Sequence, residues 1–237
     1  MNGMSQRTGL IIGEDGIERL RESSVLLVGC GAVGGYVLEG LVRAGVGKIR
    51  VVDHDVFSES NINRQILATT RTVGRSKVEV ACERAKEINP DICIEGMDTL
   101  VTEETVPEIM EGDFDLMVDA IDTLRNKIAL LEEAADRGMV TFSSMGAALH
   151  MDTQSVRVAP IMKTSTCPLA ASVRKALRDK DTSKITAVYS VEPPVVTPSE
   201  RDDHGKSVLG SLPTVPAVFG MTLANLVIMH ICRNDDS

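Results

Sequence analysis

The sequence has 237 residues, of which 43% are hydrophobic, and its formal net charge is −9. A chain of this length can bury one large core, so one main domain is expected. The acidic balance argues against a large nonspecific nucleic-acid surface, because phosphate binding needs a concentrated positive field. A local basic stretch is interpreted either as a solvated helix face or as a basic groove: Arg174, Lys175, Arg178, Lys180 and Lys184.

No two of the five cysteines stand in a C-x-x-C pair, so neither a zinc site nor a redox couple is indicated. The first residues, MNGMSQRTGLIIGEDG, lack the apolar core of a secretory signal. Reduced thiols and a cytoplasmic location are therefore expected. The apolar stretch from Val215 to Cys232 is interrupted by Pro216, Gly220, Asn225 and His230, which predicts a buried terminal helix and no membrane span, with membrane contact as the alternative.

From residue 25 onward, short β-rich runs alternate with segments of helical length, as in a parallel sheet covered by helices. We predict a doubly wound, Rossmann-like α/β fold with a mainly parallel sheet and helices on both faces. Residues 1–146 form the nucleotide-binding core of this single domain, and residues 147–237 form a substrate-side extension with a terminal helix. The predicted strands are Val25–Val28, Ile49–Asp53, Ile92–Met97, Phe114–Ala120, Met139–Ser143, Gln154–Val158 and Thr186–Ser190.

The segments between these runs supply the helices, and Asn89-Pro90 gives a stop signal for one of them. The stretch Glu192–Lys206 contains prolines among charged residues and cannot continue a helix or a central strand. An exposed, mobile loop is expected there. The predicted helices are Val33–Ala44, Lys77–Asn89, Thr102–Met110, Leu124–Gly138 and Pro168–Arg178, followed by the terminal one.

A glycine motif follows the first predicted strand. The run VLLVGCGAVGG places Gly29, Gly31 and Gly34 as G-x-G-x-x-G before a helix, where glycines let the backbone approach a phosphate and free N–H groups attract negative charge. Asp53 ends the next strand, 24 positions after Gly29. This is close to the offset of about 20 residues at which an acidic side chain meets ribose hydroxyls. These two features alone suggest an NAD enzyme.

The loop after Asp53 changes that interpretation. Asn61, Asn63, Arg64 and Gln65 offer hydrogen-bonding groups, and Lys77 adds a second positive charge at the start of a helix. A triphosphate under attack at its α-phosphorus needs such charges, whereas a nicotinamide enzyme has no comparable need. ATP is therefore favoured over NAD.

Two carboxylates follow the strand FDLMVDA. Asp119 and Asp122 stand at its carboxyl end, where ligands bind in open α/β sheets. Carboxylates beside phosphates suit Mg²⁺, which takes only one or two protein carboxylates. Asp122 is predicted to bind the metal, with an N-cap of the helix at Leu124 as the alternative, and the role of Asp119 stays open.

In chain order, these motifs resemble the adenylation core of the ThiF, MoeB and ubiquitin-activating superfamily, from about Arg7 to Gly146. The resemblance implies ATP and Mg²⁺ as cofactors, with Asp53 at the ribose, Arg64 and Lys77 at the phosphates and Asp122 at the metal. Arg64, Lys77 and Asp122 would be catalytic. The nucleotide pocket would comprise Gly29, Gly31, Ala32, Gly34, Asp53, Asp55, Asn61, Asn63, Arg64, Gln65, Lys77, Asp122 and Thr123.

The sequence departs from the superfamily at two of these positions. Ala32 stands where many members have a glycine, and Thr123 stands where many have an asparagine. Alanine still permits close backbone approach, so binding should survive. Arg7 resembles the arginine that one subunit of these dimers lends to its partner's site, so a homodimer is expected, and the alternative is a solvent-exposed arginine.

The second half resembles the threonylcarbamoyladenosine dehydratases, through SSMGAALHMDTQSVRVAPI, KTSTCPLAASVRKALR, YSVEPPVV and SLPTVPAVFG. That resemblance implies ATP-dependent cyclisation of threonylcarbamoyladenosine beside the tRNA anticodon. Two alternatives remain: adenylation of the Gly-Gly end of a ubiquitin-like sulfur carrier, and an NAD-dependent dehydrogenase. The missing C-x-x-C pairs lower the odds of a sulfur-carrier activator. Cys167, before Pro168 at a helix start, is either a relay thiol for such a partner or a small loop residue.

Overall fold

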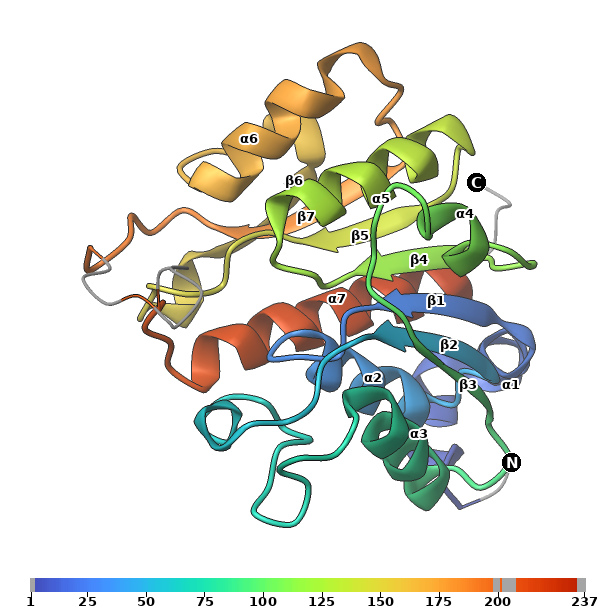
Figure 1. Cartoon of the computed structure of the whole chain (residues 1–237). Helices are drawn as coiled ribbons and strands as arrows, with labels where there is room; N and C mark the ends of the chain where they lie inside the picture. Colours follow the sequence, from blue (N-terminus) through green and yellow to red (C-terminus); the bar gives the residue numbers. More distant parts are fainter. Residues whose placement is uncertain (1–2, 198–200, 202–207, 234–237) are drawn as a thin grey trace.

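The computed structural model describes residues 3–197, 201 and 208–233, in which seven strands form one sheet (Figure 1). The strands are β1 (Ser24–Val28), β2 (Lys48–Asp53), β3 (Cys93–Asp98), β4 (Leu116–Asp119), β5 (Thr141–Ser144), β6 (Val156–Pro160) and β7 (Ile185–Ser190). Their order is β3-β2-β1-β4-β5-β7-β6, with β6 antiparallel to β7 and every other pair parallel. The predicted doubly wound fold is confirmed.

Helices cover both faces of the sheet (Figure 1). They are α1 (Gln6–Glu22), α2 (Gly34–Ala44), α3 (Lys77–Ile88), α4 (Val106–Ile109), α5 (Leu124–Asp136), α6 (Pro168–Ala176) and α7 (Thr214–Cys232). α1, α2, α3 and α7 share one core, whereas α4, α5 and α6 pack on the opposite face. α4 is shorter than predicted, because Thr102 and Thr105 hold a turn in which the Thr102 N–H donates to Thr105 Oγ1 at 2.8 Å.

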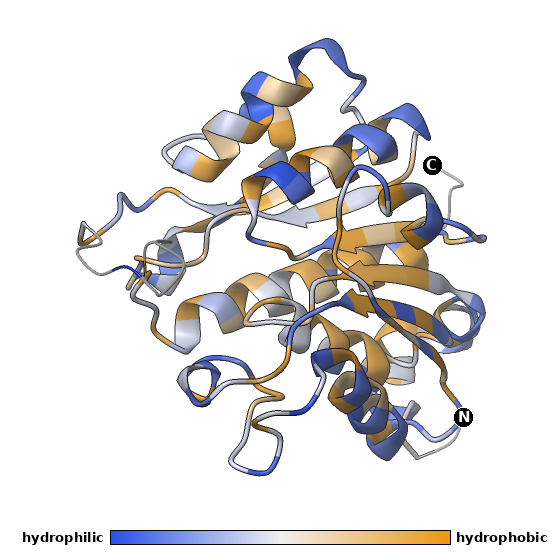
Figure 2. Cartoon of the chain, viewed as in Figure 1, coloured by the Kyte–Doolittle hydropathy of each residue, from blue (hydrophilic) through white to orange (hydrophobic). Residues whose placement is uncertain are grey.

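Strand β1 shows why the sheet occupies the centre. Side chains alternate between the faces of a strand, and here both faces are buried. Val25 and Leu27 enter the core beneath α2 and α7, while Leu26 and Val28 enter the core beneath α4 and α5. Figure 2 accordingly shows hydrophobic central strands and hydrophilic outer turns.

α7 is long and apolar enough to cross a membrane by composition, and it is the single such helix in the described part of the chain. One side of it packs tightly against α2. A Cβ added at Gly40 would lie 2.6 Å from the Ala224 Cβ, and one added at Gly220 would lie 2.5 Å from the Val33 carbonyl oxygen. Val215, Phe219 and Leu223 are fully buried, so this side of α7 belongs to the core, as predicted, whereas Met221 and Met229 are exposed.

α1 is a helix that the sequence patterns did not indicate. It bends at Gly13, whose φ of +76° lies outside the helical region. The half after the bend buries Ile17 and Leu20, but the half before it leaves Leu10 and Ile11 more than four-fifths exposed, at 83% and 87%. This first half also carries Arg7, which is exposed.

Candidate functional site

The glycine-rich turn lies at the carboxyl end of β1, where two of its glycines have no room for a side chain. Gly29 has a φ of +93°, and a Cβ there would lie 2.8 Å from the Ala120 carbonyl group. A Cβ at Gly34 would lie 1.9 Å from the Gly29 oxygen. Gly31 differs, since the nearest atom to an added Cβ is Gln65 Nε2 at 3.8 Å. Space therefore remains open above Gly31 for a ligand, as a phosphate loop requires.

Asp53, at the end of β2, fixes this turn. Its Oδ2 accepts the Cys30 N–H at 2.7 Å, and its Oδ1 accepts the Asp55 N–H at 3.0 Å. Each carboxylate oxygen can accept further hydrogen bonds. Asp53 thus joins the glycine-rich turn to the loop after β2 and retains capacity for ribose hydroxyls.

Lys77 begins α3 and turns back toward the same strand end. Its Nζ lies 2.8 Å from Asp55 Oδ2, and its side chain is only 8% exposed, while that of Asp55 is 51% exposed. The Lys77 N–H also donates to the Asp55 carbonyl oxygen at 3.0 Å. An ammonium group has three donors, so Lys77 can bind a phosphate while it keeps Asp55.

The loop between β2 and α3 holds the second cation. Arg64 Nη1 donates to the Ser60 carbonyl oxygen at 2.9 Å and to Asn63 Oδ1 at 2.7 Å. Asn63 Nδ2 donates to the Ser211 carbonyl oxygen at 3.0 Å, which ties this loop to the segment before α7. Asn61 Oδ1 accepts the Ser58 N–H at 3.1 Å and so supports the turn that carries Arg64.

Gln65 is buried beside Gly31, and its Oε1 has no hydrogen-bond partner among the described residues. An unpaired buried acceptor is unfavourable, so such atoms commonly mark the place of a missing donor. A ligand above Gly31 can supply that donor. Gln65 therefore fits the predicted nucleotide pocket.

The two aspartates after β4 have different surroundings. Asp119 is fully buried and binds Lys127 and Ser143, so it is not available to a metal. Asp122 is exposed, and its Oδ1 accepts the Thr123 hydroxyl at 3.3 Å. The N-cap residue of α5 is Thr123, so the alternative of an Asp122 N-cap was wrong. Lys127 was not predicted as a site residue, because a lysine inside a helix normally faces water.

A second group of potential metal ligands lies at the end of β2. Asp53, His54 and Asp55 each offer one potential ligand atom, and these three atoms lie within 4.8 Å of one another. Lys77 already neutralises Asp55, and Asp53 binds two backbone N–H groups. These contacts disfavour Asp53 and Asp55 as metal ligands, and Mg²⁺ binding by Asp122 stays a prediction.

These groups meet at one place in the sheet. β1 lies between β2 and β4, and the chain crosses from one half of the sheet to the other there. Open α/β sheets bind ligands in the crevice at the carboxyl ends of strands beside such a switch point. The structure thus brings the glycine-rich turn, Asp53 and Lys77 to the edge that carries Asp122.

The extension after residue 146 is tied to the segment before α7. Leu149, whose φ is +66°, donates its N–H to the Gly210 carbonyl oxygen and accepts the Val195 N–H, each at 2.9 Å. Glu192 Oε2 accepts the N–H groups of Met151 and Asp152 at 2.9 and 3.0 Å. The described start of the predicted mobile loop is therefore anchored, and most of the rest of that loop lies outside the described residues.

His150 is a buried group in this extension that the sequence analysis did not single out. Its Nδ1 lies 3.7 Å from Glu192 Oε2, and its side chain is 5% exposed. Burial lowers the pKa of His150, and the nearby Glu192 carboxylate opposes that shift. The ring therefore favours its neutral form.

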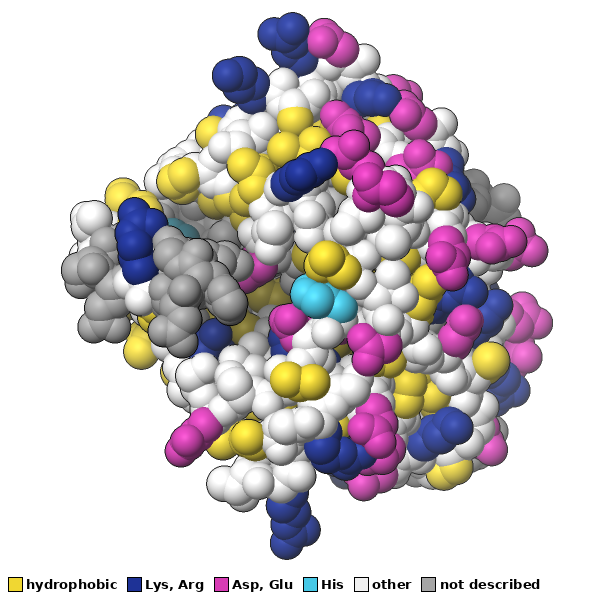
Figure 3. Space-filling view, in the orientation of Figure 1, with side chains coloured by type: hydrophobic (Ala, Val, Ile, Leu, Met, Phe, Trp, Pro, Cys, Tyr) yellow, Lys and Arg dark blue, Asp and Glu magenta, His cyan; other side chains and the backbone are white. Residues whose placement is uncertain are grey.

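The basic stretch after Cys167 is largely paired. Lys180 Nζ lies 2.6 Å from Asp136 Oδ2, Arg178 Nε lies 3.0 Å from Asp179 Oδ2, and Arg174 Nη1 donates to Thr164 Oγ1 at 2.7 Å. Figure 3 shows Lys and Arg side chains over α6, with acidic groups beside them. These contacts favour the interpretation as a solvated helix face.

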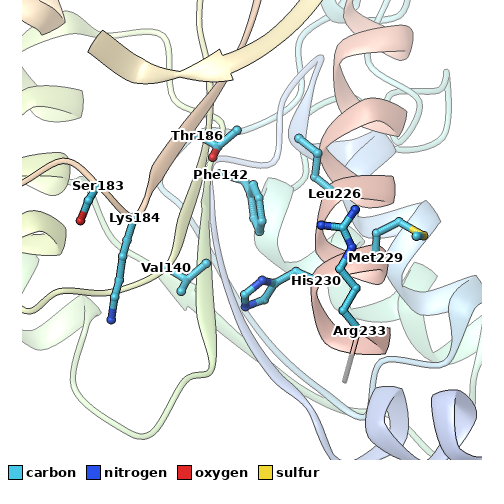
Figure 4. Close-up of a pocket in the computed structure, with 9 residues that line it drawn as sticks. All are labelled: Val140, Phe142, Ser183, Lys184, Thr186, Leu226, Met229, His230 and Arg233. Carbon is cyan, nitrogen blue, oxygen red and sulfur yellow. The ribbon is translucent and has the colours of Figure 1, made fainter. Parts of the chain in front are cut away.

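A cavity of about 380 Å³ lies elsewhere in the molecule (Figure 4). It opens at the amino ends of β5 and β7, against the end of α7, and so faces away from the glycine-rich turn. It is not the candidate nucleotide site. Its lining residues are Val140, Phe142, Ser183, Lys184, Thr186, Leu226, Met229, His230 and Arg233.

Comparison with known proteins gives a consistent picture. The model of the ThiF family matches residues 5–237. A tRNA threonylcarbamoyladenosine dehydratase of Bacillus subtilis is 35% identical over 96% of this chain and 94% of its own length. The solved structure of the Escherichia coli tRNA N6-threonylcarbamoyladenosine dehydratase in complex with ATP has a TM-score of 0.87 and 28% identity, covering 96% of this chain and 93% of that one.

A sulfur carrier protein adenylyltransferase of Thermus thermophilus is also similar, at 41% identity, but over only 52% of this chain and 45% of its own length. The dehydratases therefore match residues after 146 as well as the first part of the chain. The sulfur-carrier enzyme matches about half of the chain.

Proposed function

The chain belongs to the ThiF family, and we propose that it uses ATP to cyclise threonylcarbamoyladenosine beside the anticodon of tRNA. The observation that carries the proposal is the Lys77 ammonium, nearly buried and turned toward the end of β2 that the glycine-rich turn adjoins. Arg64 supplies a second cation from the adjoining loop. An NAD enzyme needs no such cations.

The proposed chemistry needs no enzyme nucleophile. A carboxylate is a poor electrophile because its leaving group would be oxide, so its oxygen first attacks the α-phosphorus of ATP and pyrophosphate leaves. The ureido nitrogen of the same nucleoside then attacks the acyl carbon, AMP leaves, and the nitrogen loses its proton. Ring closure is intramolecular and is favoured by proximity alone.

Six of the predicted pocket residues have a task in this scheme. Lys77 and Arg64 balance the charge that develops on the phosphates, and Asp53 holds the ribose. Asp122 would hold Mg²⁺, which would supply positive charge to the pyrophosphate. Gly31 leaves the backbone accessible to the phosphate chain, and Gln65 supplies a buried acceptor.

Calorimetric titration of the purified chain with ATP and Mg²⁺, and separately with NAD, tests the proposal. We expect heat of binding with ATP and none with NAD at the same concentrations. Tight NAD binding without a response to ATP would return the protein to the dehydrogenase alternative.

We further propose a homodimer in which Arg7 reaches the partner's nucleotide site. The first half of α1 presents Leu10 and Ile11 almost fully to solvent, as expected of a surface that a second copy covers. Sedimentation at micromolar concentration should show a dimer, and Leu10→Lys with Ile11→Lys should shift it toward monomer. A wild-type chain that sediments only as a monomer would leave Arg7 a solvated surface residue.

The proposed cyclisation assigns residues 1–146 to the binding of ATP and residues 147–237 to the binding of tRNA. All five cysteines are free, which fits a reducing compartment such as the cytoplasm.

Direct cyclisation predicts that Cys167→Ala retains most activity. Cys167 is 4% exposed and packs among Leu131, Ala170 and Val173, so its contacts are those of a small apolar residue. Single-turnover assays on threonylcarbamoyl-modified tRNA measure the effect, with Cys93→Ala, at an exposed cysteine, as the control. If a folded, ATP-binding Cys167→Ala chain were as inactive as Lys77→Ala, a covalent relay through this thiol would replace direct cyclisation.

A further inference from the structure

A buried polar cluster lies directly behind the loop that carries Asp122. Asp119 Oδ2 lies 2.5 Å from Lys127 Nζ and accepts the Ser143 hydroxyl at 2.6 Å. Lys127 Nζ also lies 3.5 Å from Ser143 Oγ. All three residues are 0% exposed. The cluster thus joins the end of β4, the first turns of α5 and strand β5.

Lys127 contacts both ends of the loop from residue 119 to residue 123, which carries Asp122. Its Nζ binds Asp119 at the start of the loop, while its backbone N–H donates to the Thr123 carbonyl oxygen at 2.9 Å at the end. Between these ends, the Ile121 N–H donates to Asp119 Oδ1 at 3.2 Å. Side-chain contacts of Lys127 and Asp119 thus hold the first residues of the segment 119–123, and the backbone of α5 holds its last residue.

The same loop forms one wall of the glycine-rich turn. The Ala120 N–H donates to the Val28 carbonyl oxygen at 2.8 Å, and the Ala120 carbonyl group lies so close to Gly29 that a Cβ there would be 2.8 Å away. Any shift of Ala120 would therefore move the glycine-rich turn together with Asp122.

Stability alone does not explain a fully buried ion pair. Desolvation of both charges offsets most of their attraction, and well-packed apolar residues of similar volume often give an equal or greater stability. What the charged cluster adds is a fixed geometry. We propose that Lys127, Asp119 and Ser143 are positioning residues, which hold Asp122 and the glycine-rich turn in register for ATP and its metal. This inference rests on the proposed function.

The test replaces the whole cluster by apolar residues, with Asp119→Leu, Lys127→Met and Ser143→Ala in one chain. Because no charge is left unpaired, this triple variant should fold and melt near the wild-type temperature. Hydrogen–deuterium exchange without nucleotide should rise in residues 119–126 and stay unchanged in β1 and α7. Affinity for ATP with Mg²⁺, and turnover, should each fall by about 10- to 100-fold, as when groups that orient a metal ligand are removed.

A milder pair of variants covers the case in which the triple variant fails to fold. Ser143→Ala removes one hydroxyl from the cluster. Thr141→Val removes an equally buried hydroxyl two residues earlier on β5, which donates to the Met139 carbonyl oxygen at 3.1 Å and not to the cluster. Only Ser143→Ala should increase exchange in residues 119–126 and lower ATP affinity.

Two outcomes would overturn the positioning role: a folded triple variant with wild-type exchange and ATP affinity, or equal effects of Ser143→Ala and Thr141→Val. Exchange is measured without ligand, so it still decides the matter if the wild-type chain fails to bind ATP. That last result would refute the proposed function separately.

Discussion

Lys77→Ala and Arg64→Ala should each lower the rate of carboxylate activation by about a hundredfold, because each removes a charge that stabilises the transferring phosphate, an effect of ~3 kcal/mol. Lys77 is the stronger case. Its ammonium is held almost out of solvent beside Asp55, and electrostatic interactions strengthen where water is excluded. The Asp55 carboxylate is half exposed and stays hydrated when Lys77 is removed, so the variant should fold.

One lysine variant and one arginine variant serve as matched controls. Lys86 is exposed near the end of α3, the helix that Lys77 begins, and Arg71 is exposed in the loop that carries Arg64. Lys86→Ala and Arg71→Ala change the net charge equally without touching the proposed phosphate site. In single-turnover assays on modified tRNA, both control variants should react at the wild-type rate. If Lys77→Ala retained that rate too, its ammonium would have no part in phosphate chemistry.

Gly34→Ala should damage folding and nucleotide binding together. The new methyl group would lie 1.9 Å from the Gly29 carbonyl oxygen, so the backbone of the turn must move. Overpacking of this kind costs about 3 kcal/mol, which lowers the melting temperature by roughly 6 to 12 °C in a chain of this size. A turn displaced by an ångström should weaken catalysis by about a hundredfold.

Gly31→Ala separates these two effects. An added methyl group there meets no atom closer than 3.8 Å, so the melting temperature should stay at the wild-type value. The methyl group would nevertheless occupy the space proposed for a phosphate, and ATP affinity should fall. Thermal unfolding and ATP titration of both variants give the comparison. A Gly34→Ala chain that melted like the wild type would contradict the close contact between Gly29 and Gly34.

Most of the fold was predictable because its signals are local. Continuous apolar runs marked β1 and β4, and the glycine motif marked the junction of β1 with α2. α1 was missed because it contains Gly9, Gly13 and Gly16, and glycine is unfavourable inside a helix. Its formation depends on contacts with α7 that are distant in sequence, such as Arg19 Nη2 donating to the Cys232 carbonyl oxygen at 2.8 Å.

The site was predictable to the extent that its residues are adjacent in motifs. The order of Asp53, Arg64, Lys77 and Asp122 along the chain indicated that they lie at one edge of the sheet. In the structure, the carboxyl ends of β2 and β4 lie at the same edge, on either side of β1. Their roles at the nucleotide remain predictions. The pairing of Asp119 with Lys127 was not predictable, because nothing in the sequence distinguishes a buried lysine from a solvated one. Only the packing of α5 against β5 shows it.

Mass analysis of the modified nucleosides in tRNA from cells that lack this chain is the most direct test of the proposed cyclisation. We expect the cyclic form of threonylcarbamoyladenosine to disappear and the open form to accumulate, with restoration by the wild-type gene and not by one encoding Lys77→Ala. The result that would contradict the account is a normal level of the cyclic form in those cells.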